Sequence, residues 1–486
     1  MIRDAETIEP GAFRDRTFDV CIVGAGPAGI TLARRLGAAG KRVGLFEGGG
    51  LEYEQASQEV YEGTTTGQPY YPLDGCRLRY FGGTSNHWGG WTRALEADDF
   101  EPRPHNPLSG WPIEKADLDP YAGEADDILN LPPVTAAPDV LPEQGDLRPQ
   151  LFRFSRPTTR FGEKYQAELE SSANIETYLN ANLVDLRIDE NGKRVTEAVF
   201  RTYGREEPFT VRASAFVLCL GGLENPRALL NANTQIAAGL GNEHDLVGRY
   251  FLEHPHAPVG SALLRDAPPS MLVYSPTPDL MRTQKILNFG LRIGYFDQWN
   301  APKFTGAFDP SPACAVDFAT ALEAQVSGAS APCPGLVVDV FVACEQSLDP
   351  SNRVRLIDER DRFGWRRIAL DWRLSKMDVR TLTTAATKAA EAMATYDIGR
   401  MKLADWVANG EAPGVDNVWG GNHHMGTTRM SDNPRTGVVD ADCKVHGFDN
   451  LYIGGSSVFA TSGHANPTYS IVQLALRLGD HLRAKT

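Results

Sequence analysis

Residues 19–50 read DVCIVGAGPAGITLARRLGAAGKRVGLFEGGG, and this stretch decides the fold. An apolar run leads into a glycine turn, an amphipathic segment follows, and a second apolar run ends at Glu47. The pattern predicts a strand, a helix and a second strand, the βαβ unit that carries a dinucleotide. Gly24 permits the tight turn, Gly26 lets the backbone approach a pyrophosphate, and Gly29 lets helix and strand pack closely.

The acidic residue at the end of this unit supports dinucleotide binding over a plain glycine-rich turn. Glu47 follows Gly29 by 18 residues, a spacing at which its carboxylate can accept a hydrogen bond from a ribose hydroxyl. Both NAD and FAD contain this ribose and a pyrophosphate, so the motif alone does not choose between them.

Two later stretches predict further parts of the same domain. Residues 175–203 alternate apolar and polar positions around Glu190-Asn191-Gly192, which indicates a hairpin, and residues 213–230 indicate a buried strand, a glycine turn and a helix. Residues 450–482 repeat that order, with Asn466 expected as the helix N-cap and Pro467 at its first position.

The stretches between these pieces differ in character and predict a second domain that is inserted twice. We expect a nucleotide-binding domain from residues 1–100, 172–255 and 411–486, and a substrate-binding domain from residues 101–171 and 256–410. Within the second, residues 301–334 are rich in Ala, Ser and Pro and predict either a lid over the site or a surface insertion.

Charge and cysteine content narrow the class of protein. A formal net charge of -14 with no Lys/Arg cluster argues against nucleic acid or an anionic membrane as a partner. No stretch reaches the roughly 18 apolar residues of a membrane span, and the first residues lack the apolar core of a signal peptide. The seven cysteines form no CxxC pair, which argues against zinc, haem and iron-sulfur sites. We therefore expect a cytoplasmic protein without a metal.

Several motifs occur in the order of one known family. They are VGAGPAG (23–29) with Glu47, FGGTSNHWGGW (81–91), GGLENPR (221–227), NHHMGTTRM (422–430) and GHANPT (463–468). The chain resembles the glucose-methanol-choline (GMC) oxidoreductases, FAD enzymes that oxidise alcohols, and within them the pyranose 2-oxidase-like branch of sugar and glycoside oxidoreductases. The resemblance covers both ends and the middle of the chain and is weakest in residues 256–340.

The resemblance selects FAD over NAD and implies a fold class. That class is α/β, with an FAD-binding Rossmann-like domain of the GMC or p-hydroxybenzoate hydroxylase-like type interleaved with an α+β substrate domain built on an antiparallel sheet. His87 stands where some members bind the flavin covalently, and whether it does so here is left open. The residues implied to bind FAD are Gly24, Gly26, Gly29, Glu47, Gly83, Thr84, Asn86, His87, Val184, Gly221, Gly455, Asn466, Pro467 and Thr468.

The resemblance also implies the catalytic pair. Its H-x-x-G pattern makes His423 the base, and the position after the second glycine turn makes Asn466 its partner at the substrate oxygen. In the alternative interpretation His423 is only a buried, hydrogen-bonded histidine and Asn466 only caps its helix. Because successive side chains of an extended segment point to opposite faces, His424 should pack behind the site.

Three further residues in or near the motifs are not expected to take part in catalysis. We expect a structural role for His254 and a structural salt bridge for Arg429, whereas His464 could line the substrate site.

These observations predict an FAD-dependent oxidoreductase that oxidises a secondary alcohol of a sugar or glycoside to a ketone. Hydride goes to flavin N5, His423 is the base, and electrons leave to O₂ or an external acceptor. Two alternatives stay open: oxidation of a non-sugar alcohol, and a lyase in which the flavin is structural. The C-terminal motifs with His423 and Asn466 disfavour a nucleotide-binding or electron-transfer module without its own chemistry. The sequence does not give the substrate, the carbon oxidised or the oligomeric state.

Overall fold

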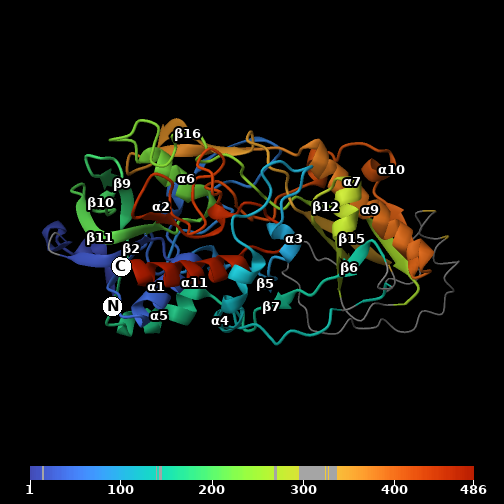
Figure 1. Ribbon diagram of the computed structural model, residues 1–486, viewed down its shortest axis with the longest axis horizontal. Coiled ribbons are helices and arrows are strands. Elements are labelled where there is room, and N and C mark those ends of the chain that lie inside the picture. Colours follow the sequence, from blue (N-terminus) through green and yellow to red (C-terminus); the bar gives the residue numbers. More distant parts are fainter. Residues whose placement is uncertain are drawn as a thin grey trace.

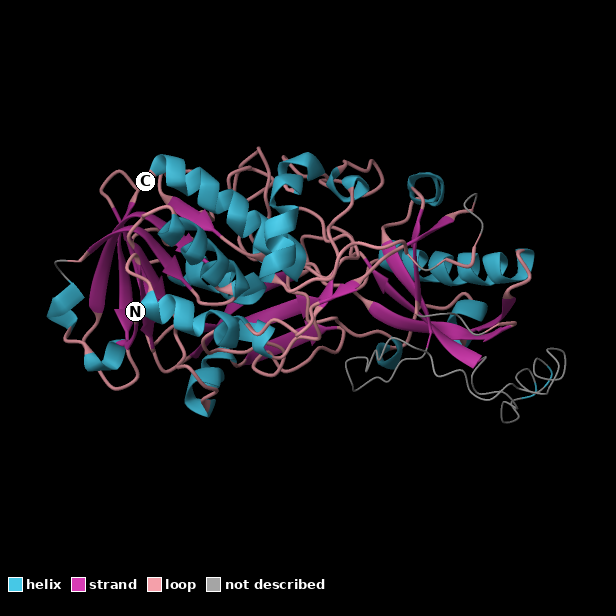
Figure 2. Ribbon diagram, turned by 90° about the horizontal axis from the view of Figure 1, so that it is seen from below, coloured by secondary structure: helices cyan, strands magenta, loops and turns pink. Residues whose placement is uncertain are grey.

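A computed structural model gives the architecture of the chain, and it describes residues 1–13, 16–137, 139–141, 145–266, 271–294, 323, 327 and 337–486. Two large sheets lie toward opposite ends of an elongated molecule (Figures 1 and 2). The expected lid or insertion at 301–334 falls almost entirely outside the described residues.

The first sheet has eight strands and contains the predicted βαβ unit. The pairs that join β1, β8, β3, β2, β11 and β19 are parallel, and β10 and β9 extend the sheet as the predicted antiparallel hairpin. In spatial order its strands are β1 (Ile2–Asp4), β8 (Ile175–Leu179), β3 (Val43–Phe46), β2 (Thr17–Val23), β11 (Phe209–Leu218), β10 (Val195–Arg201) and β9 (Asn182–Ile188), with β19 (Leu451–Ile453) paired to β11.

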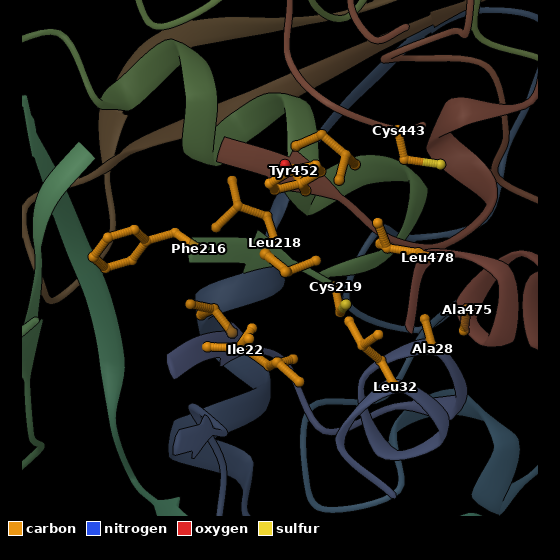
Figure 3. Packing of buried hydrophobic residues seen from close by; sticks show 14 of the residues in the cluster. Ile22, Ala28, Leu32, Phe216, Leu218, Cys219, Cys443, Tyr452, Ala475 and Leu478 are labelled. Carbon is orange, nitrogen blue, oxygen red and sulfur yellow. The ribbon is translucent and has the colours of Figure 1, made fainter. Parts of the chain in front are cut away.

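Two helices from opposite ends of the chain cover this sheet together. α1 (Pro27–Ala38) and α11 (Thr468–Lys485) pack side by side (Figure 1). Figure 3 shows Leu32 of α1, Leu478 of α11, and Ile22 and Leu218 of the central strands among the side chains of one buried cluster. Burial of these apolar side chains brings the start of α1 close to the start of α11, which creates the site described below.

The second large sheet has six strands and is antiparallel throughout. Its long helix α9 (Lys376–Thr395) begins with a capping box formed by Ser375 and Asp378. Alternate residues of the central strand β14 lie in a cluster with residues of α9, so the residues between them face the opposite way. The strands, in spatial order, are β18 (Gly399–Leu403), β12 (His256–Leu264), β15 (Val337–Cys344), β14 (Phe289–Gly294), β13 (Leu272–Pro276) and β6 (Leu147–Pro149).

Smaller elements connect the two parts. β17 (Arg366–Trp372) pairs with β16 (Arg353–Arg360) on one side and with β4 (Gly63–Gly67) on the other, and β16 contacts α6 (Gly221–Asn231). α5 (Phe161–Ser171) contacts α1 and β8. The other elements are β5 (Trp91–Thr92) and β7 (Arg153–Phe154), which pair, and the helices α2 (Gln55–Gln58), α3 (Ala97–Phe100), α4 (Ala122–Ile128), α7 (Pro278–Gln284) and α10 (Asp405–Ala408).

These contacts bear on the expected division into domains. β16, β17 and α5 were assigned to the substrate-binding domain, and each of them contacts elements of the nucleotide-binding part. The division into two domains stays a proposal. Within the described ranges, no helix combines the length and the apolar character required to cross a membrane.

Candidate active site

A cavity of about 670 Å³ lies where the starts of α1, α6 and α11 converge. This volume is within the range of small-molecule and cofactor sites. Most residues between Gly83 and Trp91 and the segment 421–424 form further parts of its wall. The cavity therefore joins the glycine loop at the beginning of the chain to both C-terminal motifs.

The three glycines of the first loop have different surroundings. A Cβ at Gly24, where φ is +104°, would lie 2.5 Å from the Cys219 carbonyl oxygen, and one at Gly29 would lie 1.9 Å from the Gly24 carbonyl oxygen. A Cβ at Gly26 would have no atom within 4 Å, yet Gly26 lines the cavity. Gly24 and Gly29 are therefore required by the fold, whereas Gly26 keeps open a space that the protein does not fill.

The surroundings of this space fit a dinucleotide. Neither α1 nor α11 has a side-chain cap at its N-terminus, so the first backbone N–H groups of both helices are open to an anion. Glu47 is buried beside them, with one carboxylate oxygen accepting the Ala25 N–H at 2.8 Å and the other the Gly49 N–H at 3.0 Å. Helix starts for a pyrophosphate and a fixed acid for a ribose are what FAD requires.

Most of the residues expected to bind the cofactor line this cavity. Besides Gly24, Gly26 and Glu47, they are Gly83, Thr84, His87, Gly221, Gly455, Asn466, Pro467 and Thr468. His87 is exposed, and its Nε2 lies 3.1 Å from the Tyr80 hydroxyl.

Three of the expected residues do not line it. Gly29 is inside the helix packing, and the Asn86 amide donates to the Phe81 carbonyl at 2.8 Å. The Val184 carbonyl accepts the indole N–H of Trp365 at 2.6 Å, and the neighbouring Leu183 lines the cavity instead.

His423 and His424 enter different surroundings, as expected of neighbours in an extended segment. Nε2 of His423 lies 3.1 Å from the Asn466 amide nitrogen. The His424 ring packs instead near Tyr70 and Phe251, with ring centroids 6.0 Å away in each case. Burial lowers the pKa of His424 to about 3, and burial followed by neighbouring charges lowers the pKa of His423 well below its usual value. Both rings are therefore neutral near pH 7.

The start of α11 differs from the expectation by one residue. The N-cap is Pro467 and the helix begins at Thr468, so Asn466 does not cap it. The reason is that the Asn466 amide turns toward His423, while its Oδ1 is buried without a hydrogen-bond partner. The Asn466 Oδ1 can therefore accept a hydrogen bond from a ligand hydroxyl, and the Asn466 amide N–H, which faces His423, can donate one.

A second histidine fixes the tautomer of the first. His254 Nε2 lies 3.3 Å from the Ser462 carbonyl, which can only accept, so this nitrogen carries the proton. Nδ1 of neutral His254 is then an acceptor, and it lies 2.9 Å from Nδ1 of His423. His423 must donate there, which leaves its Nε2 unprotonated and facing Asn466. These two successive hydrogen bonds leave Nε2 of His423, a residue that lines the cavity, able to accept a proton.

Glu253 holds the backbone around these histidines. Its carboxylate accepts N–H groups from His254, Gly421 and His423, and the Tyr70 hydroxyl also donates to it. Burial raises the pKa of Glu253 to about 6, although all four hydrogen bonds act in the opposite direction. One carboxylate therefore ties the segment before β12 to the segment that carries His423.

Sequence reasoning missed part of this arrangement. His254 was expected to be structural, yet it contacts the candidate base directly, and Glu253 was not singled out. The only local signal was the clustering of an acid and two histidines in GRYFLEHPH (248–256).

The expected salt bridge of Arg429 is wrong. Its guanidinium donates to the carbonyls of Thr436 and Leu108 and lies over the Tyr250 ring, and within the described residues it has no carboxylate partner. Searching the described part of the chain gives no cluster of three His, Cys, Asp or Glu residues that could hold a metal ion.

Comparison with known proteins agrees with this geometry. A family profile described as GMC oxidoreductase matches residues 349–475. The 2-methyl-1,2-propanediol dehydrogenase of Mycolicibacterium austroafricanum is 24% identical, and the alignment covers 96% of this chain and 95% of that protein. The 6'''-hydroxyparomomycin C oxidase of Streptomyces lividus is 25% identical, with coverages of 98% and 94%.

A solved structure shows the same fold. The pyridoxine 4-oxidase from Mesorbium loti superposes with a TM-score of 0.57 at 18% identity, and the match covers 96% of this chain and 99% of that one.

Proposed function

Because the chain belongs to the GMC oxidoreductases and is an FAD-dependent enzyme acting on CH–OH groups, we propose that it oxidises a secondary alcohol of a sugar or glycoside to a ketone. The observation that carries the proposal is the pair of His423 and Asn466, with the unprotonated Nε2 of His423 at the wall of the cofactor cavity.

The roles of the residues follow from their hydrogen bonds. Bound FAD supplies the acceptor for the hydride that leaves the carbinol carbon. The substrate hydroxyl donates to Nε2 of His423, which takes its proton, and the Asn466 amide donates to the same oxygen and holds its position. His254 accepts the Nδ1–H of His423 and so stabilises the ring as it becomes charged.

The names of two relatives support different substrate classes, one a sugar derivative and the other a simpler alcohol. The relative from Streptomyces lividus is named for a hydroxyparomomycin, and the relative from Mycolicibacterium austroafricanum for a small diol. Oxidation of a non-sugar alcohol is therefore the second candidate.

Further parts of the proposal concern the cofactor and its surroundings. We assign the largely parallel sheet to a Rossmann-like FAD-binding domain and the antiparallel sheet to the substrate domain. A covalent bond from His87 to the flavin, O₂ or an external compound as electron acceptor, and a cytoplasmic location all stay predictions.

Anaerobic flavin reduction tests the proposal directly. The holoenzyme is mixed without oxygen with a panel of sugars, glycosides and small diols, and loss of the visible absorption of the oxidised flavin is followed. Bleaching by a sugar or glycoside, with a ketone as product, is expected. Bleaching by diols alone would select the second candidate, and no bleaching by any alcohol would contradict both.

A further inference from the structure

One buried cation near the histidines has no acidic partner. Arg292 of β14 is 8% exposed, and its Nε has no hydrogen-bond partner. Among the described residues, no carboxylate forms a salt bridge with it. Other buried arginines have carboxylate or backbone partners: Arg103 pairs with Glu345, Arg227 pairs with Glu224 and Asp361, and Arg429 donates to the carbonyls of Thr436 and Leu108.

The strand directs Arg292 toward the candidate active site. Leu291 and Ile293 lie in the cluster that contains α9, so Gly290 and Arg292 point to the other face of the sheet. On that face a Cβ at Gly290 would lie 2.8 Å from Nδ1 of His464. His464 is 2% exposed, and neither of its ring nitrogens has a partner.

Aromatic rings complete the surroundings of the guanidinium. Its Cζ lies 4.7 Å from the ring centroid of Trp91 and 5.7 Å from that of Phe152. Phe152 also lies 6.1 Å from the His464 ring, and Trp91 lines the cofactor cavity. We call Arg292, His464, Trp91 and Phe152 the Arg292 subsite. It adjoins the cavity on the side of the antiparallel sheet.

The electrostatics of this region favour an anion. Burial lowers the pKa of Arg292 to about 10, so it is still charged at neutral pH. After burial, the charge of Arg292 contributes to the lowered pKa values of the four neighbouring histidines, which are His254, His256, His423 and His464. Arg93 and Arg148 also lower the pKa of His464, but these two cations have carboxylate partners in Glu96 and Asp98. Arg292 has no such partner among the described residues, and a buried unpaired charge is costly unless a ligand compensates it.

We propose that Arg292 binds a carboxylate of the substrate, so that the compound oxidised is a hydroxy acid of the uronic acid or uronide class and not a neutral sugar. Aromatic rings beside the guanidinium favour contacts at its edge, where a planar carboxylate can accept two parallel N–H bonds. Neutral His464 has one further N–H to donate. This inference rests on the proposed function and specifies its substrate.

Binding to the reduced holoenzyme tests the subsite without turnover. Dithionite-reduced enzyme cannot accept a hydride, so calorimetric titration without oxygen gives the dissociation constant alone. The ligands are methyl glucuronide and methyl glucoside, which share a ring and differ in a carboxylate against a hydroxymethyl group. Methyl glucoside 6-phosphate is the third ligand and distinguishes a carboxylate from another anion.

The wild type should bind the glucuronide roughly 10- to 100-fold more tightly than the glucoside, as expected of charge-assisted hydrogen bonds. Arg292→Gln should abolish this preference while the affinity for the glucoside changes little. Arg292→Lys is the matched control. It keeps the positive charge but loses the two parallel N–H donors of the guanidinium, so it should keep part of the preference for the glucuronide.

Several results would overturn the inference. They are equal affinity of the wild type for glucuronide and glucoside, no binding of either, or a preference that survives in Arg292→Gln. A phosphate bound more tightly than the glucuronide would overturn the assignment to a carboxylate. If Arg292→Gln does not fold, the affinities of the wild type and of Arg292→Lys for the glucuronide and the glucoside still test the inference.

Oxidised enzyme separates this inference from the proposed function. Preferential binding of the glucuronide without flavin reduction by any sugar supports the subsite and contradicts sugar oxidation. Flavin reduction by the glucoside as fast as by the glucuronide, with equal affinities, supports sugar oxidation and overturns the subsite.

Discussion

Replacing His254 with leucine should slow flavin reduction without emptying the cofactor cavity. His254 accepts the Nδ1–H of His423 at 2.9 Å and lines no part of that cavity. When His423 takes the substrate proton it becomes a cation, and its bond to His254 changes from a neutral to a charge-assisted one. Neutral bonds contribute about 0.5–1.5 kcal/mol and those of charged groups about 1.5–3 kcal/mol, so the charged state loses about 1–1.5 kcal/mol more than the neutral state.

This difference corresponds to a rate decrease of about 5- to 13-fold. Leucine also removes the acceptor that fixes the proton on Nδ1, and an equal mixture of the two tautomers would halve the amount of active base. We therefore expect the rate constant of flavin reduction to fall roughly 10- to 25-fold.

Stopped-flow reduction at saturating substrate, without oxygen, measures this rate constant. His254→Asn is the matched control, because its amide oxygen can accept the Nδ1–H of His423 and should restore most of the rate. The flavin content of each variant is measured in parallel. A wild-type rate in His254→Leu, or an equally slow His254→Asn with full flavin content, would refute the hydrogen-bond argument.

Four other predictions concern the same site. His423→Ala should slow flavin reduction by about 10²- to 10⁴-fold with FAD retained, whereas His424→Ala should lower the melting temperature more than the rate, and the reverse result would move the base by one residue. If His87 is bonded to the flavin, acid-precipitated protein stays yellow, and His87→Ala releases the colour into the supernatant. Gly26→Val should fold but bind no FAD, because its Cβ meets no protein atom within 4 Å, whereas Gly29→Val should fail to fold because its Cβ would lie 1.9 Å from a carbonyl oxygen. Because the pKa of His424 is about 3 when folded and about 6.5 when unfolded, the unfolded chain binds more protons below pH 6.5, and stability falls as the pH falls. Between pH 7.5 and 5.5 His424 should contribute a loss of about 1.4 kcal/mol to the free energy of unfolding, so urea titrations should show that His424→Phe reduces the loss seen in the wild type by about this amount, while the other buried histidines keep their own contributions.

Local patterns predicted the parts of the fold that local physics determines. The βαβ unit, the hairpin of β9 and β10 and the capping residues of α9 follow from periodicity, turn residues and caps within short stretches. The start of α11 was off by one residue because the Asn466 side chain bonds to His423 and not to its own helix. Tertiary contact overrode a local preference at that point.

The polar contacts of the site could not be predicted in the same way. His254 and His423 are 169 residues apart, and the Glu253 carboxylate serves a segment 168 residues further on. Motifs indicated which residues matter, but not which nitrogen of His423 carries the proton. No sequence pattern singled out Arg292. It is notable because it is buried without an acidic partner among the described residues, and this can be seen only in the folded structure.

The separation of these contacts along the chain has a consequence for the order of folding. The glycine loop and Glu47 lie within a span of about 25 residues, whereas the hydrogen bonds from His254 to Ser462 and from Glu253 to Gly421 close loops of 208 and 168 residues. Contacts between distant parts of a chain form slowly, because ordering a long loop costs entropy before any contact compensates it. During refolding, the βαβ unit with Glu47 can therefore form first, whereas the cofactor cavity, which also needs the start of α11, is completed later. Recovery of bound flavin and of activity should therefore lag behind recovery of secondary structure.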